Sequence, residues 1–218
     1  MNTAWRLDAT KILSVAEMAS VIADLKQRAT RSANARQNLC LFRLAACCGL
    51  RVSEIITLTL DDVRPMIARP HIRIRRSASK NGKARIVPLW WDGMTLADIA
   101  AWKRERQDMS AVGGDALICM LSSAKRGNAI TRFNARRRFK TCCRILGAER
   151  ISSLTVHHGR HSFISHALAG GRTLAEVRDA AGHSSLAITS IYTHVAIDDD
   201  GRIGDLFAFS AAAEGRAR

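Results

Sequence analysis

Apolar residues recur at helical intervals along most of the chain, which predicts a mainly α-helical protein. The first helix is expected from about residue 15, because Ser14 and Glu17 have the spacing of a capping box. A second apolar run, NLCLFRLAACC, predicts a helix that ends at Gly49, a residue suited to the left-handed conformation past a helix end. Ser53 is expected to cap the next helix, so Arg51 would lie in a tight turn between two helices.

The pattern changes to a period of two within residues 71–89, where isoleucines alternate with arginines. The dipeptide Asn81-Gly82 is a strong signal for a β-hairpin with a tight type I′ turn. Lys80 and Lys83 would then face each other across the first pair of the hairpin. Lysines at such a tip usually only keep an exposed sheet edge soluble. The alternative is a finger that delivers an ammonium group into a groove.

The last third of the chain predicts helices separated by glycine turns. One helix is expected over HHGRHSFISHALAGG. A second capping box, Thr173 with Glu176, precedes LAEVRDAAG, which ends at Gly182. His183 would therefore lie in the turn before a short helix that carries Tyr192, the only tyrosine in the chain.

These elements together predict an α+β protein, mainly α-helical, with a small antiparallel β-hairpin or sheet near residues 71–89. The chain of 218 residues, 47% of them hydrophobic, is long enough to bury a substantial core. Its 34 Lys and Arg against 19 Asp and Glu give a net charge of +15, which favours a polyanionic partner, nucleic acid first. A merely basic surface or a membrane-surface helix would share this balance, but the arginines are spread through several segments.

Other classes of protein fit the sequence less well. No run approaches the roughly 18 apolar residues of a membrane span, and the segment MNTAWRLDATK lacks the features of a secretion signal. A cytoplasmic protein that does not bind a membrane is therefore expected. The six cysteines form no C-x-x-C pair, so buried reduced thiols are expected and no metal site.

Six polar residues at the predicted helix ends and turns fit one reaction, attack on a phosphodiester. Such an attack needs a nucleophile, cations for the extra charge of a five-coordinate phosphorus, and an acid for the leaving oxygen. Arginine suits the second task, because its planar guanidinium binds two phosphate oxygens. A tyrosine, with a pKa of about 10, needs cationic neighbours and a histidine base to lose its proton. The six residues are Arg51, Lys80, His157, Arg160, His183 and Tyr192.

Four motifs that contain these residues resemble, in order, those of the tyrosine recombinase (phage integrase) family. ACCGLRVSEIITLTLDDV is similar to the first arginine motif of that family, and SKNGKARIVPL to its lysine hairpin. HHGRHSFISHAL is similar to its H-x-x-R-H box, and AGHSSLAITSIYTHV to its Gly-His and nucleophile segment. The resemblance covers about residues 10–200 and implies the catalytic-domain fold of the family.

The resemblance also implies a role for each candidate. Tyr192 would be the nucleophile that forms a 3′-phosphotyrosyl link and frees a 5′-hydroxyl, while Arg51 and Arg160 would bind the scissile phosphate. His157 would assist proton transfer at Tyr192, and His183 would donate a hydrogen bond to a phosphate oxygen. No cofactor and no metal are implied, because the covalent link replaces one phosphodiester by another.

Further residues of the motifs have less specific expectations. Lys80 matches the family's general acid for the 5′ oxygen, although Lys83 is close enough in sequence to be confused with it. Glu54 matches an acidic position that could orient Arg51. His161 fits the family box but is expected to orient neighbouring helices. A structural role is also expected for the other histidines, His158, His166 and His194.

The H-x-x-R-H box departs from the family pattern at one position. Gly159 stands where a leucine is common before the second arginine. A glycine inside a helix costs about 1 kcal/mol relative to alanine. It also leaves room for a close approach of another backbone.

The resemblance implies one catalytic domain over residues 1–218, without the N-terminal domain with which most members complete a clamp around DNA. The chain is similar in length to the invertases of fimbrial switches, although a truncated element or a fragment would look the same. Residues 198–218 follow an acidic break and could pack on their own domain or dock on a neighbouring subunit. The expected partners are double-stranded DNA and one to three further copies of the chain.

The function implied is site-specific DNA recombination, in integration, excision or inversion. Two alternatives share parts of the motif set. A type IB topoisomerase uses the same nucleophile and arginines to relax DNA. A non-catalytic DNA-binding relative would have no need of a preserved nucleophile.

Overall fold

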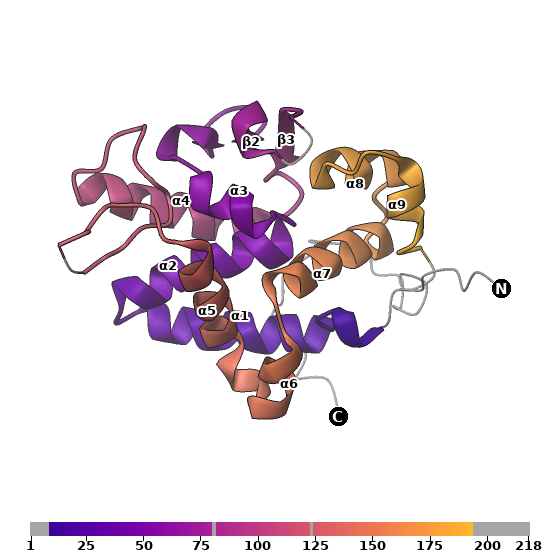
Figure 1. Cartoon of the computed structure of the whole chain (residues 1–218), viewed down its shortest axis with the longest axis horizontal. Coiled ribbons are helices and arrows are strands. Elements are labelled where there is room, and N and C mark those ends of the chain that lie inside the picture. Colours follow the sequence, from indigo (N-terminus) through magenta and orange to yellow (C-terminus); the bar gives the residue numbers. More distant parts are fainter. Residues whose placement is uncertain (1–8, 80–81, 123, 194–218) are drawn as a thin grey trace, which may run out of the picture.

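The computed structural model of the protein describes residues 9–79, 82–122 and 124–193. Its fold is α+β and mainly helical, as the sequence predicts, with one small antiparallel sheet (Figure 1). Lys80, His194 and the segment 198–218 lie outside the described residues. The strands are β1 (Val63–Arg64), β2 (His71–Ile74) and β3 (Arg85–Pro88). The α-helices are α1 (Val15–Ala29), α2 (Ala33–Phe42), α3 (Val52–Thr57), α4 (Gly93–Asp108), α5 (Arg132–Cys142), α6 (Ala148–Ser153), α7 (Val156–Ala169), α8 (Leu174–Ala181) and α9 (Leu186–Ser190).

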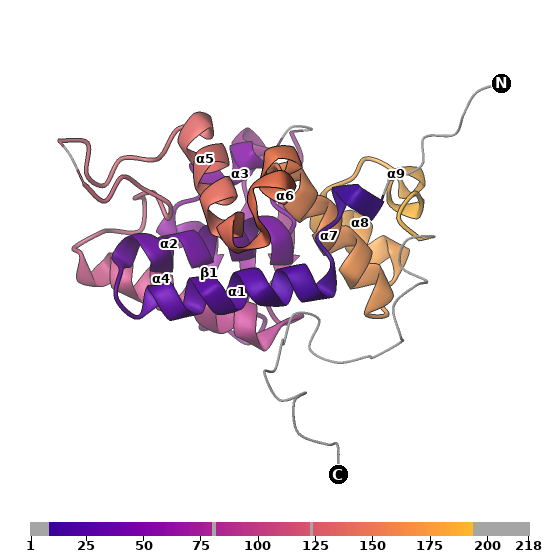
Figure 2. The same ribbon diagram turned by 90° about the horizontal axis from the view of Figure 1, so that it is seen from below.

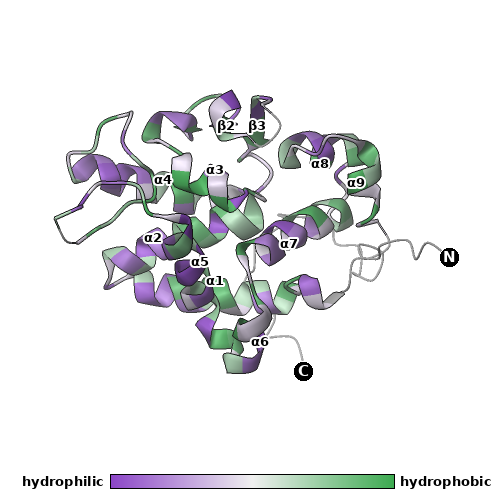
Figure 3. Ribbon diagram, in the orientation of Figure 1, coloured by the Kyte–Doolittle hydropathy of each residue, from purple (hydrophilic) through white to green (hydrophobic). Residues whose placement is uncertain are grey.

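Helices α1 and α2 pack against each other, and α4 and α5 both contact α2. Figure 2 shows α1 lying across the face of the domain that is seen from below. The predicted capping box is confirmed, since Ser14 Oγ accepts the backbone N–H of Glu17 and the Glu17 carboxylate accepts that of Ser14. Most helices carry both hydrophilic and hydrophobic residues, as Figure 3 shows. Helix α1, for example, buries Met18, Val21, Ile22 and Leu25 along one face. No helix of the described residues is long and apolar enough to cross a membrane.

The chain leaves α2 through a π-helical turn, Arg43–Cys47, and reaches the predicted stop at Gly49. Gly49 has φ +66°, and a Cβ at this position would overlap the ring of Phe163 in α7. Both facts require glycine here. The turn therefore brings the segment before α3 tightly against α7.

Ser53 does not cap α3, so that prediction is wrong. The helix begins at Val52 with Arg51 in the N-cap position, and Ser53 already lies inside its first turn. The Glu54 carboxylate accepts the backbone N–H of the N-cap residue, Arg51, at 2.8 Å. As a result, the backbone of Arg51 is fixed by the same carboxylate that contacts its side chain.

The sheet has the order β1-β2-β3 with antiparallel pairing, which confirms the predicted hairpin strands. The type I′ turn expected at Asn81-Gly82 and the Lys80–Lys83 pair lie partly outside the described residues. Within the described residues, the ladder ends where Ile74 pairs with Arg85, and Arg76–Ala78 form a 3-10 helix after strand β2.

Helix α7 packs on the π-helical turn, and Gly159 lies at this contact. A Cβ at residue 159 would lie 3.2 Å from the backbone carbonyl carbon of Ala45 and 3.2 Å from the ring of Phe139. Such distances are tighter than ordinary packing contacts. The room for a close backbone approach expected at Gly159 is therefore present and in use.

Candidate active site

Three arginine side chains from three elements converge on the C-terminal end of helix α8. Carbonyls at a helix end have no partner within the helix and carry partial negative charge, so guanidinium groups suit them well. Each arginine donates to a different one of three successive carbonyls. The bonds join Arg85 Nε to the oxygen of Ala180 (2.9 Å), Arg160 Nη2 to that of Ala181 (2.6 Å) and Arg51 Nη2 to that of Gly182 (3.2 Å).

One fully buried carboxylate, Glu54, holds two of these arginines. Its two oxygens accept Nη1 and Nη2 of Arg85 at 2.7 and 2.8 Å, and Oε1 also accepts Nη1 of Arg51 at 3.2 Å. Burial raises the pKa of Glu54, but the hydrogen bonds and charges of Arg85 and Arg51 outweigh it and hold the pKa below 4.5. The structure thus places Glu54 where the sequence expected it to orient Arg51. Arg85 is a member of the site that sequence reasoning missed.

Arg160 enters the cluster from α7 and is buried. Besides Ala181 it donates from Nη1 to the carbonyl oxygen of Gly49 at 2.6 Å. Burial, with the nearby charge of Arg51, lowers the pKa of Arg160 to about 9, so the group stays charged at neutral pH. Glu54 binds two of the three guanidinium groups and interacts with Arg160 only through its charge, so the cluster of these four residues keeps a net positive charge. An anion placed here would be stabilised by groups that are already in position.

Tyr192 lies beside this cluster, in the turn directly after α9 and not on the helix itself as the sequence suggested. Its side chain is 5% exposed, and its hydroxyl is 2.7 Å from Nδ1 of His161. Burial raises the pKa of the Tyr192 phenol above 10, although the charge of Arg160 opposes this. A phenol in this setting keeps its proton at neutral pH until a base or a new positive charge takes effect.

His161 therefore contacts the Tyr192 hydroxyl, whereas the sequence led us to expect it to orient neighbouring helices. Its ring lies 5.7 Å from that of Tyr192, centre to centre. Burial and the neighbouring positive groups lower the pKa of His161 to about 4, so its imidazole is neutral at neutral pH and can share a hydrogen bond with the Tyr192 hydroxyl. A signal was present in the sequence, because His157 and His161 are four residues apart and share one face of a helix.

His183 occupies the turn between α8 and α9, as predicted. Its Nδ1 is 3.0 Å from the hydroxyl oxygen of Thr189, and its ring centre is 6.3 Å from that of Tyr192. Burial and the charges of Arg160, Arg51 and Arg85 lower the pKa of His183 to about 3. The structure thus brings His183, Tyr192 and the arginine cluster together.

The other histidines occupy different positions. His157 lies in the first turn of α7, where desolvation and the charges of Arg160, Arg136 and Arg51 lower its pKa. The structural role expected for His158 and His166 fits their contacts. His158 Nδ1 accepts the backbone N–H of Thr155 at 3.1 Å, and His166 Nε2 is 2.7 Å from the carbonyl oxygen of Leu13.

A hollow leads into the cluster between the sheet and α8. Lys83, Arg85, Arg178 and His183 are among the residues that line it. The described residues therefore place Lys83 near the candidate site, whereas Lys80 lies outside them. The choice between the two lysines as general acid stays a prediction.

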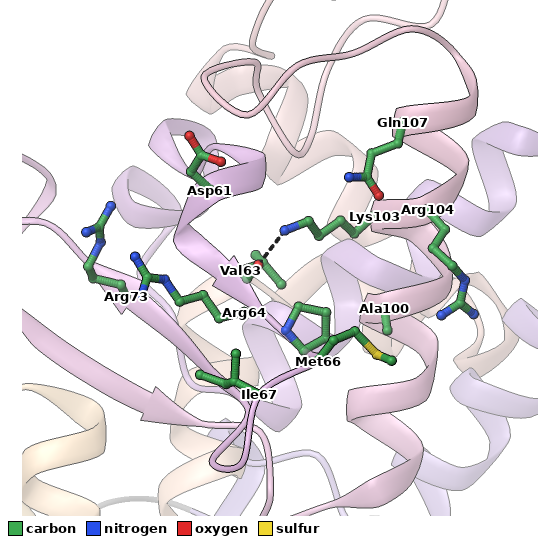
Figure 4. A pocket seen from close by; sticks show the side chains of 11 residues that line it. Asp61, Val63, Arg64, Met66, Ile67, Arg73, Ala100, Lys103, Arg104 and Gln107 are labelled. Carbon is green, nitrogen blue, oxygen red and sulfur yellow. Dashed lines mark hydrogen bonds between the residues drawn. The ribbon is translucent and has the colours of Figure 1, made fainter.

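A second hollow, between the loop after β1 and helix α4, is separate from this site (Figure 4). Met66 is 83% exposed at its edge, next to Arg64, and the Lys103 ammonium donates to the carbonyl oxygen of Val63 at 2.7 Å. None of the three clustered arginines lines it. The chemistry expected of the chain is therefore assigned to the first hollow.

Comparison with known proteins gives one consistent result. The model of the phage integrase family matches residues 12–198. The chain is 34% identical over 160 residues to tyrosine recombinase XerC of Corynebacterium efficiens, covering 73% of this chain and 47% of that protein. It is 32% identical over 149 residues to tyrosine recombinase XerD of Pseudomonas putida, covering 68% and 46%. The chain thus spans about half the length of the curated relatives that it matches.

Solved structures of recombinases share the fold. The crystal structure of XerA recombinase matches with a TM-score of 0.66 at 20% identity, over 90% of this chain and 63% of that one. XerH site-specific recombinase bound to a palindromic difH substrate, in a post-cleavage complex, matches with a TM-score of 0.67 at 23% identity, over 86% and 50%. The sequence matches, together with this fold, establish that the chain belongs to the phage integrase family, the family of the tyrosine recombinases.

Proposed function

We propose that the protein is a site-specific DNA recombinase that cuts and rejoins strands through a covalent 3′-phosphotyrosyl intermediate at Tyr192. The observation that carries this proposal is the juxtaposition of a buried tyrosine, a neutral histidine 2.7 Å from its hydroxyl, and a cluster of arginines in excess over carboxylate. A nucleophile, a proton acceptor and cations for the charge on phosphorus are the groups that cleavage of a phosphodiester by a tyrosine requires. The relatives named tyrosine recombinases support the same assignment.

In the proposed reaction, Arg51 and Arg160 bind the two non-bridging oxygens of the scissile phosphate. The Tyr192 oxygen attacks phosphorus while its proton passes to a histidine, and the bond from phosphorus to the 5′ oxygen breaks. Two histidines are candidates for the acceptor of that proton. His161 is the better placed, because its Nδ1 already contacts the hydroxyl. His157 is the candidate that the family motif implies. His183 stabilises a phosphate oxygen by a hydrogen bond.

The departing 5′ oxygen takes up a proton from Lys80 or Lys83, and rejoining runs the same steps in reverse with a new 5′-hydroxyl. Exchange of strands between two duplexes requires a cut in each of them. Two to four copies of the chain therefore act together on double-stranded DNA. The net charge of +15 favours this partner.

The test uses a pool of duplex DNA with randomised sequence in which one linkage per molecule carries sulfur in place of the bridging 5′ oxygen. A thiolate leaves without help from a general acid, because a thiol has a pKa of about 8.5. Cleavage then traps the protein on DNA whichever lysine is the acid. Wild type should give an adduct that survives detergent, and Tyr192→Phe should give none.

Two outcomes would contradict the proposal. If wild type binds the pool but forms no adduct, the protein is a DNA-binding relative without cleavage activity. If it forms adducts on every sequence and relaxes a supercoiled plasmid that lacks any enriched sequence, it acts as a topoisomerase.

A further inference from the structure

The Arg85 side chain uses its nitrogen atoms for hydrogen bonds within the protein. Its side chain is 8% exposed. Both Nη atoms donate to Glu54, and Nε donates to the carbonyl oxygen of Ala180. The forked geometry of a guanidinium allows these bonds to form at once, which an ammonium group cannot reproduce. Arg85 therefore differs from a cation that waits for a phosphate.

The same side chain packs over the turn that leads to His183. A Cβ on Gly182 would lie 2.8 Å from Arg85 Cδ and 2.9 Å from Nε, so only glycine leaves the space that Arg85 fills. Gly182 also has φ +69°, a conformation that favours glycine. The position of His183 thus depends on a turn that is closed on one side by Arg85.

Arg85 also holds the start of α3 through Glu54. The Glu54 carboxylate that it grips accepts both the backbone and the side chain of Arg51. Arg85 is moreover the first residue of β3, directly after the segment with the candidate lysines. One side chain therefore connects the anchor of Arg51, the turn before His183 and the base of the hairpin.

We propose that Arg85 is a positioning residue for the cleavage reaction, which fixes Arg51 and His183 relative to each other and to the hairpin without contacting DNA. This inference rests on the proposed function. The bidentate ion pair of Arg85 with Glu54 would keep the phosphate-binding groups in position. A small displacement of such groups lowers the rate of cleavage strongly.

The experiment compares Arg85→Lys, which keeps the charge, and Arg85→Gln, which removes it, with Arg178→Gln as a matched control. Arg178 lines the same hollow, and among the described residues its side chain bonds to the exposed Asp179. The first readout needs no DNA. Hydrogen exchange should speed up about tenfold at the amides of Gly182 and His183 in both Arg85 variants, and not in the control.

The second readout separates binding from cleavage on the sulfur-containing DNA pool. Both Arg85 variants should lose about tenfold or more in single-turnover cleavage rate, while their dissociation constants for the pool stay within about threefold of wild type. A structural role alone would lower folding stability without this split between rate and binding.

Three results would overturn the proposal. Wild-type cleavage by Arg85→Lys would show that charge suffices without the fork. An equal loss of binding and rate would place Arg85 on the DNA. Unchanged exchange at Gly182 and His183 would show that the turn does not depend on Arg85. If wild type itself cleaves nothing, the proposed function fails, and the exchange measurement still decides whether Arg85 holds the turn.

Discussion

Replacement of Glu54 by glutamine is the most informative perturbation of the site, because one fully buried carboxylate supports two arginines. The amide keeps one acceptor oxygen and turns an NH2 group toward the Arg85 guanidinium. Removal of one partner from a buried ion pair costs about 3–5 kcal/mol. Arg51 is 18% exposed at its side chain and can regain water, whereas Arg85 at 8% cannot. We therefore expect a loss near the lower end, about 3 kcal/mol in the free energy of unfolding.

The loss should depend on pH with a defined sign. The folded-state pKa of Glu54 lies below its ordinary value of 4.5. The carboxylate therefore stabilises the fold fully above pH 4.5, and this contribution disappears as the pH falls through the lower folded-state pKa. Glu54→Gln lacks this titration. The difference between wild type and variant should be largest at pH 7 and shrink in acid.

Urea unfolding followed by tryptophan fluorescence measures that difference, since the chain has four tryptophans. Urea unfolding curves of wild type and variant are recorded at pH 7 and at several pH values below 4.5. Other acid-sensitive groups contribute equally to both proteins, so their effect cancels in the difference between the two free energies. A difference below about 1 kcal/mol at pH 7 would place the pair among weak surface ion pairs. A difference that stays constant into acid would refute the ionised state assigned to Glu54.

Three further predictions concern the packing and protonation of the domain. Gly159→Leu should overpack the contact of α7 with Ala45 and lower stability by about 1–3 kcal/mol, and an unchanged melting temperature would show that the contact gives way. The six cysteines are all buried, and burial raises the pKa of Cys47 to about 11, so a thiol reagent should react quickly only after unfolding; rapid reaction of the native protein would contradict this. NMR titration should find His161 and His183 neutral down to about pH 4 and 3, so protonation of the unfolded state lowers stability as pH falls below 6.5; midpoints near 6.5 would exclude the buried arrangement.

Local features of the fold were predictable from the sequence, because their causes lie within a few residues. Ser14 with Glu17 and Thr173 with Glu176 form the capping boxes that their spacing predicts. The predicted helix end at Gly182 has the left-handed conformation that glycine favours. In each case, the bonding partners are three or four residues apart.

The errors arose where a distant contact decided the outcome. Ser53 had the right residue type for a cap, but α3 begins at Val52, before Ser53. There Glu54 binds the backbone of Arg51 and also binds Arg85 from another element. The tight turn expected at Asn81-Gly82 lies partly outside the described residues, but strand β2 already ends at Ile74, before the 3-10 helix Arg76–Ala78. The residue types of a turn or a cap do not show which distant contacts fix where the neighbouring strand or helix ends.

In the candidate site, too, the residues of short motifs were predictable from the sequence, and the contacts between distant segments were not. The motifs named Arg51, Arg160, His183 and Tyr192, and the structure brings these residues together. Arg85 is not among the candidates that the motifs name, because nothing in the local pattern distinguishes a buried forked pair from an exposed charge. Which histidine meets the Tyr192 hydroxyl likewise depends on the position of α9 against α7, a tertiary contact.

The central claim is that the hydroxyl of Tyr192 attacks a DNA phosphate, and peptide mass spectrometry of the trapped adduct tests it most directly. The adduct from the sulfur-containing DNA pool is digested with nuclease and protease, and the modified peptide is sequenced. Tyr192 is the only tyrosine, so any phosphotyrosyl linkage in this chain identifies it. The account predicts a nucleotide joined through its 3′ phosphate to Tyr192. A nucleotide on any other residue, or a 5′ phosphate on Tyr192, would contradict it.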